Sequence, residues 1–195
     1  MQISFTKKIP ISTCNIYNKK TNEFERATLY EIDCKDSEDI DYLHYLQGSD
    51  ENWDFQDSIA YDAKEKYLDF KYYPQCENPD KFYALETKNS EVACLCETQP
   101  LLKDINIRYI ESNPNKLYKF AGQIMLANIA RLLLKTSQNL QIHSPSFEAR
   151  DFYSKTCGFK QDSNGFGYEL TQKDMEDFIK RIEKRTKGKI LNCII

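Results

Sequence analysis

Alternation of apolar and polar residues along the chain predicts a sheet built from short strands. The segments with this pattern are residues 12–17, 24–33, 81–87, 91–97, 105–111, 139–143, 159–161 and 165–170. Short polar stretches at residues 18–22, 88–90 and 162–164 each separate two consecutive segments. We therefore expect three hairpins within the sheet.

Helical spacing of apolar residues predicts helices between the strands. The segments concerned are residues 40–46, 57–72, 124–134, 146–157 and 171–187. Thr171 and Asp174 form a capping-box pattern that marks the start of the last helix. Around the third helix, Asn128, Arg131 and Lys135 form a narrow polar stripe among apolar residues. We therefore expect that helix to be largely buried.

Composition and charge limit the classes of protein to consider. The chain has 195 residues, of which 41% are hydrophobic, enough for one substantial core. A net charge of −3 and a pI near 5.5 argue against non-specific binding to nucleic acid or to a membrane surface. No stretch is apolar enough to span a membrane, and the first residues lack the apolar core of a signal peptide. We expect a cytoplasmic protein.

The cysteines and histidines favour packing over metal binding or disulfides. The seven scattered cysteines suit a reducing compartment. Cys94 and Cys96 lie on one face of a predicted strand, and neither His44 nor His143 lies near a C-x-x-C pair, so we expect no metal site. Cys157 with His143 could form a thiol nucleophile, but no third orienting group is in view. A buried cysteine is the better interpretation.

A predicted strand, a tight loop and an apolar helix follow one another around residues 113–123, NPNKLYKFAGQ. Free backbone N–H groups at a helix start, together with the positive end of the helix dipole, bind phosphate without a cationic side chain. Gly122 lacks a Cβ, which lets a ligand approach the backbone closely. An ordinary crossover connection has the same pattern, so both interpretations stay open on this stretch alone.

Two stretches together resemble the GNAT superfamily of N-acetyltransferases. Residues 113–122 align with the family's acyl-CoA loop, a Pro and then Arg/Gln-x-x-Gly-x-Gly/Ala before a long apolar helix. Residues 149–159, ARDFYSKTCGF, resemble its next signature, Ala-x-x-Phe-Tyr-x-x-x-Gly-Phe. The resemblance covers residues 81–170, an acyl-CoA-binding core. Outside it, we expect an N-terminal hairpin and two helices in residues 1–80, and a C-terminal helix and an apolar tail in residues 171–195.

The resemblance implies a single GNAT-like domain of the α/β (α+β) class, with a mixed, mostly antiparallel central sheet flanked by helices. The chain departs from the family pattern at three positions and by one inserted residue. The usual Arg/Gln falls on Leu117, the first glycine on Phe120, and a common asparagine on Ser146. One additional residue stands between Tyr153 and Gly158.

The resemblance also implies acetyl-CoA as the co-substrate. Residues at the family's cofactor positions are Ile110, Ser112, Leu117, Lys119, Phe120, Ala121, Gly122, Gln123, Ser146 and Tyr153. Backbone groups of Ile110 and Ser112 would hold the acetyl and pantetheine portions. The N–H groups of residues 119–123 would hold the pyrophosphate.

Two catalytic roles follow from the chemistry of acetyl transfer to an amine. Tyr153 resembles the family's general acid, which protonates the departing thiolate. Glu111, at the end of the central strand, is the first candidate for the general base, and Glu97 is the second. A base that acts through water is an alternative.

The expected function is acetyl-CoA-dependent N-acetylation of a primary amine on a small molecule or a protein. Leu117 and Phe120 favour the alternative, a non-catalytic binding or regulatory module with the same fold. Acidic side chains within residues 33–41 either attract a cationic acceptor or begin a helix. The apolar residues 190–195 form either a protein-interaction segment or a strand against the sheet.

Overall fold

The computed structural model describes residues 8–41, 43, 59–72, 80–113, 115, 117–143 and 145–192. Its strands are β1 (Ile9–Asn18), β2 (Glu23–Ile32), β3 (Lys81–Thr87), β4 (Val92–Pro100), β5 (Asp104–Ser112), β6 (Tyr118–Lys119), β7 (Asn139–His143), β8 (Lys160–Gln161), β9 (Gly167–Leu170) and β10 (Leu191–Asn192). Its helices are α2 (Ile59–Tyr72), α3 (Ala121–Leu133), α4 (Phe147–Asp151) and α5 (Gln172–Thr186). A π-helix, η1 (Phe152–Cys157), continues α4.

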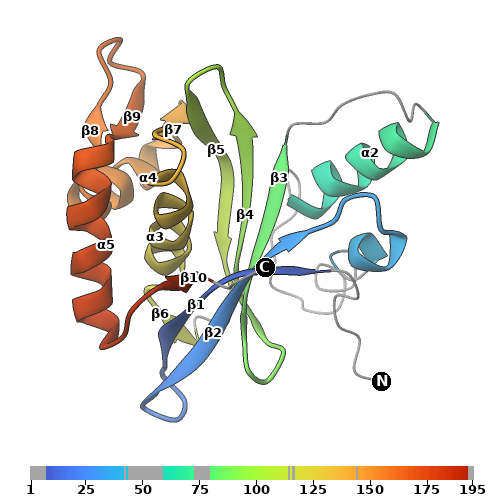
Figure 1. Cartoon of the computed structure of the whole chain (residues 1–195), viewed down its shortest axis with the longest axis horizontal. Coiled ribbons are helices and arrows are strands. Elements are labelled where there is room, and N and C mark those ends of the chain that lie inside the picture. Colours follow the sequence, from blue (N-terminus) through green and yellow to red (C-terminus); the bar gives the residue numbers. More distant parts are fainter. Residues whose placement is uncertain are drawn as a thin grey trace.

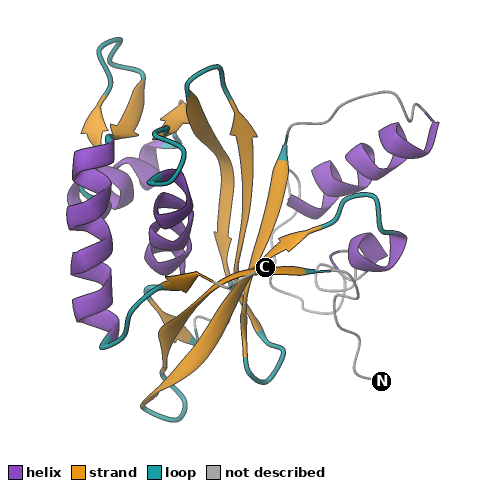
Figure 2. Cartoon of the chain, viewed as in Figure 1, coloured by secondary structure: helices purple, strands orange, loops and turns teal. Residues whose placement is uncertain are grey.

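One twisted sheet organises the molecule (Figure 1). Its strand order is β10-β1-β2-β3-β4-β5-β7-β9-β8, with β6 paired to β1. The pairings are antiparallel except that between β5 and β7, which is parallel. Helices α3, α4 and α5 lie on one side of the central strands and α2 lies on the other, as Figure 2 also shows. A mixed, mostly antiparallel sheet flanked by helices confirms the expected fold class.

Each face of the sheet has its own apolar core. The larger core lies between the sheet and helices α3 and α5, and the smaller one lies between the sheet and α2. Because side chains alternate along a strand, β5 contributes to both. Ile110 packs against the larger core, whereas Tyr109 packs against the smaller one.

Helix α3 is almost fully buried, as its apolar pattern predicts: every residue from Ala121 to Ala130 is buried. Asn128, one of the three residues in the polar stripe, is buried too, at 0% exposed. The Asn128 Oδ1 accepts a hydrogen bond of 2.6 Å from the Ser12 hydroxyl, and its Nδ2 donates one of 2.7 Å to the Ile124 carbonyl. A satisfied polar contact of this kind fixes α3 against β1.

Strands β5 and β7 pair only near their starts. Their register runs from Asp104 opposite Asn139 to Asn106 opposite Gln141. Beyond this point the His143 N–H donates to the side-chain Oδ1 of Asn106 at 3.1 Å, and β5 continues to Ser112 without β7 as its neighbour. Beyond Asn106, β5 therefore continues without pairing to β7.

Sequence patterns located most elements to within a few residues. Residues 118–119 differ, because they form β6 on β1 where a loop was expected. In the apolar tail, residues 191–192 form β10 on β1, which is the strand interpretation. The predicted helix over residues 40–46 is helical at residues 37–41 and 43, and its remaining positions lie outside the described residues.

Replacing Asn128 with Ala tests the polar contact that fixes α3. The change leaves the buried Ser12 hydroxyl without its acceptor and opens a small cavity, so we expect a loss of about 2–3 kcal/mol in the free energy of unfolding. Urea denaturation followed by circular dichroism measures it. Arg131→Ala, on the same helix but half-exposed, should stay within about 0.5 kcal/mol of wild type.

A double-mutant cycle separates the contribution of the Ser12–Asn128 hydrogen bond from the other effects of replacing Asn128 in α3. Ser12→Ala and Asn128→Ala should be non-additive, because each removes the same bond. Additive effects would show that the contact does not stabilise the fold.

Candidate functional site

The loop before α3 is shaped by Phe120, which stands where the family has its first glycine. Phe120 has a φ of 65° and a ψ of 16°, in the left-handed region that glycine adopts freely and a bulky side chain adopts with strain. The backbone therefore has a conformation that a glycine at this position would adopt freely. The Phe120 ring gains a compensating contact, since the Arg185 guanidinium carbon lies 5.0 Å from its centroid.

The start of α3 has the features of an anion site. Its N-cap, Phe120, provides no side-chain cap, and the first turn contains no acidic residue. The first backbone hydrogen bond runs from the Ile124 N–H to the Phe120 carbonyl at 2.8 Å. The N–H groups of Ala121, Gly122 and Gln123 therefore have no partner within the helix, and the helix dipole is positive there.

Gly122 lies in a crowded place between this helix start, β5 and η1. A Cβ built on Gly122 would lie 3.3 Å from the Phe152 ring, 3.5 Å from the Ser112 hydroxyl oxygen and 3.8 Å from Ile110 Cδ1. The structure thus brings together three of the predicted cofactor residues, Ile110, Ser112 and Gly122. Phe152 joins them from η1, so the glycine is needed for packing as well as for access to the backbone.

Two other predicted cofactor residues lie beside this point. Lys119 belongs to β6 opposite Tyr17, and its Nζ lies 4.7 Å from the centre of the Tyr17 ring. The Leu117 carbonyl accepts a hydrogen bond of 2.8 Å from the Lys19 N–H, and the Leu117 side chain packs against the larger core. Both residues therefore lie in the segment that precedes α3 rather than in its first turn.

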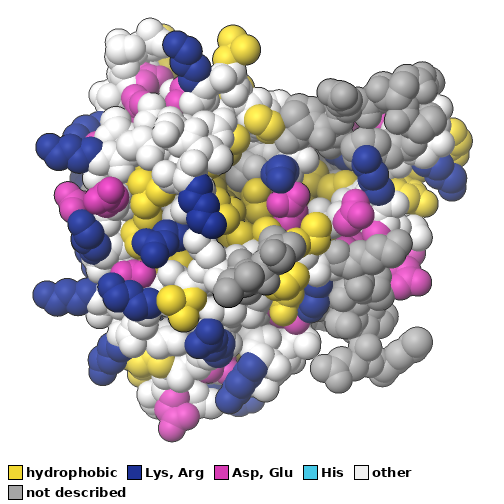
Figure 3. Space-filling model, in the orientation of Figure 1, with side chains coloured by type: hydrophobic (Ala, Val, Ile, Leu, Met, Phe, Trp, Pro, Cys, Tyr) yellow, Lys and Arg dark blue, Asp and Glu magenta, His cyan; other side chains and the backbone are white. Residues whose placement is uncertain are grey.

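Arg185 is a site residue that the sequence did not single out. It lies in the last turn of α5, and its guanidinium donates a hydrogen bond of 2.8 Å to Gln123 Oε1 while it lies over Phe120. Lys and Arg side chains gather over α5, on the left of Figure 3. A guanidinium beside an uncapped helix start favours a bound anion. No local pattern signals this role, since Arg185 follows an ordinary amphipathic spacing 62 residues after Gln123.

Glu111 has an unusual environment at the other face of the sheet. Burial raises its pKa from 4.5 to about 7, although a hydrogen bond from the Ile59 backbone N–H acts in the opposite direction. Ile59 is the first residue of α2. Glu111 therefore changes its protonation state near neutral pH, as a general base requires.

Glu97, the second candidate for the general base, forms an ion pair with Arg108. It is 0% exposed, and its Oε1 accepts a hydrogen bond of 2.8 Å from Arg108. Arg108 occupies the extra position where the register of β4 and β5 shifts, a β-bulge, and also lies 3.7 Å from Asp80. This pairing leaves Glu111 as the candidate base of the two.

Tyr153 is 6% exposed and packs in the larger core. Its ring contacts those of Phe152 and Phe159 edge to face, at centroid distances of 5.1 and 5.9 Å. Burial, with smaller effects from Cys96, Cys157 and Cys94, raises the pKa of the Tyr153 hydroxyl well above its usual value. The hydroxyl therefore keeps its proton at physiological pH.

The π-helix accounts for the additional residue between Tyr153 and Gly158. A π-helix closes its hydrogen bonds one residue later than an α-helix, so it accommodates an inserted residue within the same length of element. Residues 152–157 form this wide turn, and Gly158 ends it with a φ of 81°. The Arg181 guanidinium, which donates to the Cys157 carbonyl at 2.6 Å, lies close to that end.

Ser146 has a structural contact in addition to its predicted role. It is the N-cap of α4, and its hydroxyl accepts a hydrogen bond of 3.3 Å from the Ala149 N–H. The alternative thiol nucleophile receives no support. Cys157 is 0% exposed with a pKa raised by burial to about 12, whereas His143 is exposed and bonded to Gln141.

The described cysteines, Cys14, Cys34, Cys94, Cys96 and Cys157, are free and buried, as expected; Cys76 and Cys193 lie outside the described residues, as does His44. In the acidic stretch, carboxylates hold the chain at a helix start. The Asp36 carboxylate accepts from the Glu38 N–H at 2.8 Å, and the Asp33 carboxylate accepts from the Lys35 N–H at 2.9 Å. Among the helices described, none combines the length and apolar character needed to cross a membrane.

Comparison with known proteins identifies the fold. No protein-family model matches the sequence, and no curated protein is significantly similar to it. A chimera of the spermidine N-acetyltransferase SpeG from Vibrio cholerae and hSSAT superposes with a TM-score of 0.55 at 13% identity, over 77% of this chain and 98% of that one. AtaTR bound with AcCoA superposes with a TM-score of 0.53 at 12% identity, over 77% and 96% of the two chains. The chain therefore has the fold of the GNAT superfamily of N-acetyltransferases.

Proposed function

We propose that this protein is an acetyl-CoA-dependent N-acetyltransferase that acts on a primary amine of a small molecule or a protein. The observation that carries the proposal is the placement of Glu111. Glu111 lies near the end of β5, beyond the residues that pair with β7, and its pKa is raised to about 7. The fold supports the proposal, because structures that share it include spermidine N-acetyltransferases and a complex with AcCoA.

The cofactor half of the site is formed on the α3 face of the sheet. The N–H groups of residues 121–123 and the Arg185 guanidinium would bind the pyrophosphate of acetyl-CoA. Ile110 and Ser112, beside Gly122, would position the pantetheine and the acetyl group. Phe120 supplies the left-handed turn that aims the N–H groups.

The chemical steps use one residue from each face of the sheet. Ionised Glu111 accepts a proton from the acceptor's ammonium group, directly or through a water molecule, and the free amine then attacks the thioester carbonyl. The C–S bond breaks as the amide forms, and the CoA thiolate takes a proton from the Tyr153 hydroxyl. The surplus proton on the new amide nitrogen then returns to the Tyr153 phenolate through water. Tyr153 suits the donor role because it remains protonated at neutral pH.

A non-catalytic module with the same fold is the second candidate. It is favoured by the departures at Leu117 and Phe120. Binding and chemistry are therefore tested separately.

Calorimetric titration with acetyl-CoA tests the cofactor site. We expect a dissociation constant in the micromolar range, about −8 kcal/mol at 1 μM. Arg185→Met should weaken binding about tenfold, because it removes a charge-assisted contact with phosphate. Lys180→Met removes a charge from the same helix at an exposed position and should change nothing. Absence of binding heat with folded wild-type protein would remove the enzyme proposal.

The pH dependence tests Glu111. Below pH 7 the protonated carboxyl cannot accept a proton, so kcat/KM should rise about tenfold per pH unit and level off above pH 7. Glu111→Gln should lower the rate about 10²- to 10⁴-fold and remove the rise of kcat/KM with pH below pH 7. The assay follows free CoA with a thiol reagent, using polyamines, aminoglycosides and lysine peptides as acceptors.

Stability provides a readout of Glu111 that needs no acceptor. Its pKa is raised in the folded state, so the folded protein holds this proton more tightly than the unfolded chain. The contribution of Glu111 to stability is therefore fully present below about pH 4.5 and declines as the pH rises to about 7. Relative to wild type, Glu111→Gln should gain stability across this range, whereas exposed Glu176→Gln should not. Parallel pH profiles for wild type and Glu111→Gln would rule out the raised pKa.

Replacing Tyr153 with Phe tests the general acid. The change removes one oxygen and keeps the ring that packs against Phe152 and Phe159. Turnover should fall about 10²- to 10⁴-fold while acetyl-CoA binding survives. A tyrosine with a packing role alone would lose about 1 kcal/mol of stability or less and keep its chemical rate.

A further inference from the structure

Two lysines and two aromatic rings form a row beside the start of α3. Lys119 of β6 lies opposite Tyr17 of β1, and Tyr17 lies opposite Phe24 of β2. Residues directly opposite each other on antiparallel strands share a face of the sheet. Lys187, the C-cap of α5, reaches the row from its other end, with its Nζ 5.5 Å from the centre of the Phe24 ring. We call these four residues the lysine–aromatic row.

The rings hold both ammonium groups in place. Lys119 Nζ lies 4.7 Å from the centre of the Tyr17 ring, and the Tyr17 and Phe24 rings contact edge to face at a centroid distance of 5.1 Å. A cation over an aromatic ring is attracted by the negative face of the ring. Both lysines are exposed, so a ligand can reach them from solvent.

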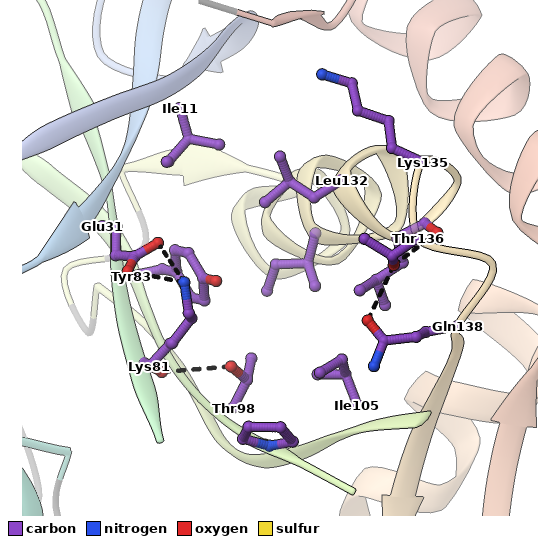
Figure 4. A pocket seen from close by; sticks show the side chains of 13 residues that line it. Ile11, Glu31, Lys81, Tyr83, Thr98, Ile105, Leu132, Lys135, Thr136 and Gln138 are labelled. Carbon is purple, nitrogen blue, oxygen red and sulfur yellow. Dashed lines mark hydrogen bonds and ion pairs between the residues drawn. The ribbon is translucent and has the colours of Figure 1, made fainter. Parts of the chain in front are cut away.

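No carboxylate neutralises these two lysines. Other cations of the chain are paired: Lys81, on the wall of the cavity of about 470 Å³ in Figure 4, is held by both oxygens of Glu31 at 3.0 and 3.1 Å. Within the part of the chain that the structure describes, Lys119 and Lys187 form no ion pair. An anionic ligand can therefore bind them without displacing a carboxylate.

The acidic residues of the same hairpin lie on its other face. Glu23 and Glu25 flank Phe24 along β2, and successive side chains of a strand point to opposite faces. The Glu25 carboxylate also accepts a hydrogen bond of 3.0 Å from Asn18. The face that carries the lysine–aromatic row is therefore positive.

The row adjoins the proposed pyrophosphate site. Lys119 directly precedes Phe120, whose carbonyl accepts the first hydrogen bond of α3. Lys187 lies two residues after Arg185, which we assign to the pyrophosphate. In CoA a single ribose joins the pyrophosphate to a third phosphate group, the 3′-phosphate. With the pyrophosphate at the start of α3, the 3′-phosphate lies one sugar away, within reach of two long lysine side chains.

We propose that Lys119 and Lys187 bind the 3′-phosphate of CoA, so that the protein selects CoA thioesters over thioesters that lack this phosphate. The inference rests on the proposed function, from which it takes the position of the pyrophosphate. Two ammonium groups form charge-assisted hydrogen bonds with one phosphate. Because the rings of Tyr17 and Phe24 hold the ammonium groups before the ligand arrives, less freedom is lost on binding. Both rings belong to the N-terminal hairpin, outside the region that resembles the family.

Calorimetric titration with CoA and with 3′-dephospho-CoA tests the proposal. Wild-type protein should bind CoA about tenfold more tightly than dephospho-CoA. Lys187→Met and Lys119→Met should each lower this ratio to about threefold by weakening CoA binding alone, because dephospho-CoA has no partner for the missing ammonium group. Lys173→Met removes the same charge from the exposed far end of α5 and should leave both affinities unchanged.

The two ligands also separate this proposal from the proposed function. Both contain the pyrophosphate and the pantetheine, so equal binding of the two by wild type would overturn the 3′-phosphate assignment alone. Binding of neither would remove the proposed function as well. An equal loss of affinity for both ligands in Lys187→Met would place that ammonium group at the pyrophosphate and overturn its assignment. Added salt should narrow the ratio in wild type, because exposed charges are screened; a ratio that does not change with salt would contradict an ionic contact.

Discussion

The burial of α3 against the sheet is the constraint on which the rest of the structure depends. Ten consecutive residues, Ala121 to Ala130, are buried, so packing rather than capping holds the helix. This allows the helix to begin with a strained residue and no side-chain cap. The polar groups at its start can then remain available for a ligand, because the stability of the helix does not depend on satisfying them locally. The Asn128–Ser12 hydrogen bond makes this packing specific, because it joins one position of α3 to one position of β1.

The two proposed catalytic residues depend on different parts of the chain. Tyr153 lies in the larger core together with α3, inside the region that resembles the family. Burial raises the pKa of Glu111, and the hydrogen bond from Ile59, at the start of α2 and before that region, opposes this effect. A residue outside the region that resembles the family therefore influences the acidity of the proposed base. Changes in α2 would alter the working pH of the site without altering the cofactor face.

The strands, the buried helix and the loop around Gly122 could be predicted because local periodicity and short motifs determine them. Other features depend on contacts between distant segments. The role of Arg185 requires the end of α5 to lie beside the start of α3, and the burial of Asn128 requires a hydroxyl on β1. Nor does sequence alone show that Phe120, which stands at the family's glycine position, has a left-handed backbone. In each case the deciding energy comes from tertiary packing, which residue patterns do not record.

The π-helix at residues 152–157 has a consequence for how this protein can vary. An inserted residue in an α-helix rotates everything that follows by about 100°, whereas here the wide turn absorbs it, and Phe159 still reaches the ring of Tyr153 at a centroid distance of 5.9 Å. A chain with one residue fewer at this point would close an ordinary α-helical turn and keep the contact between Tyr153 and Phe159.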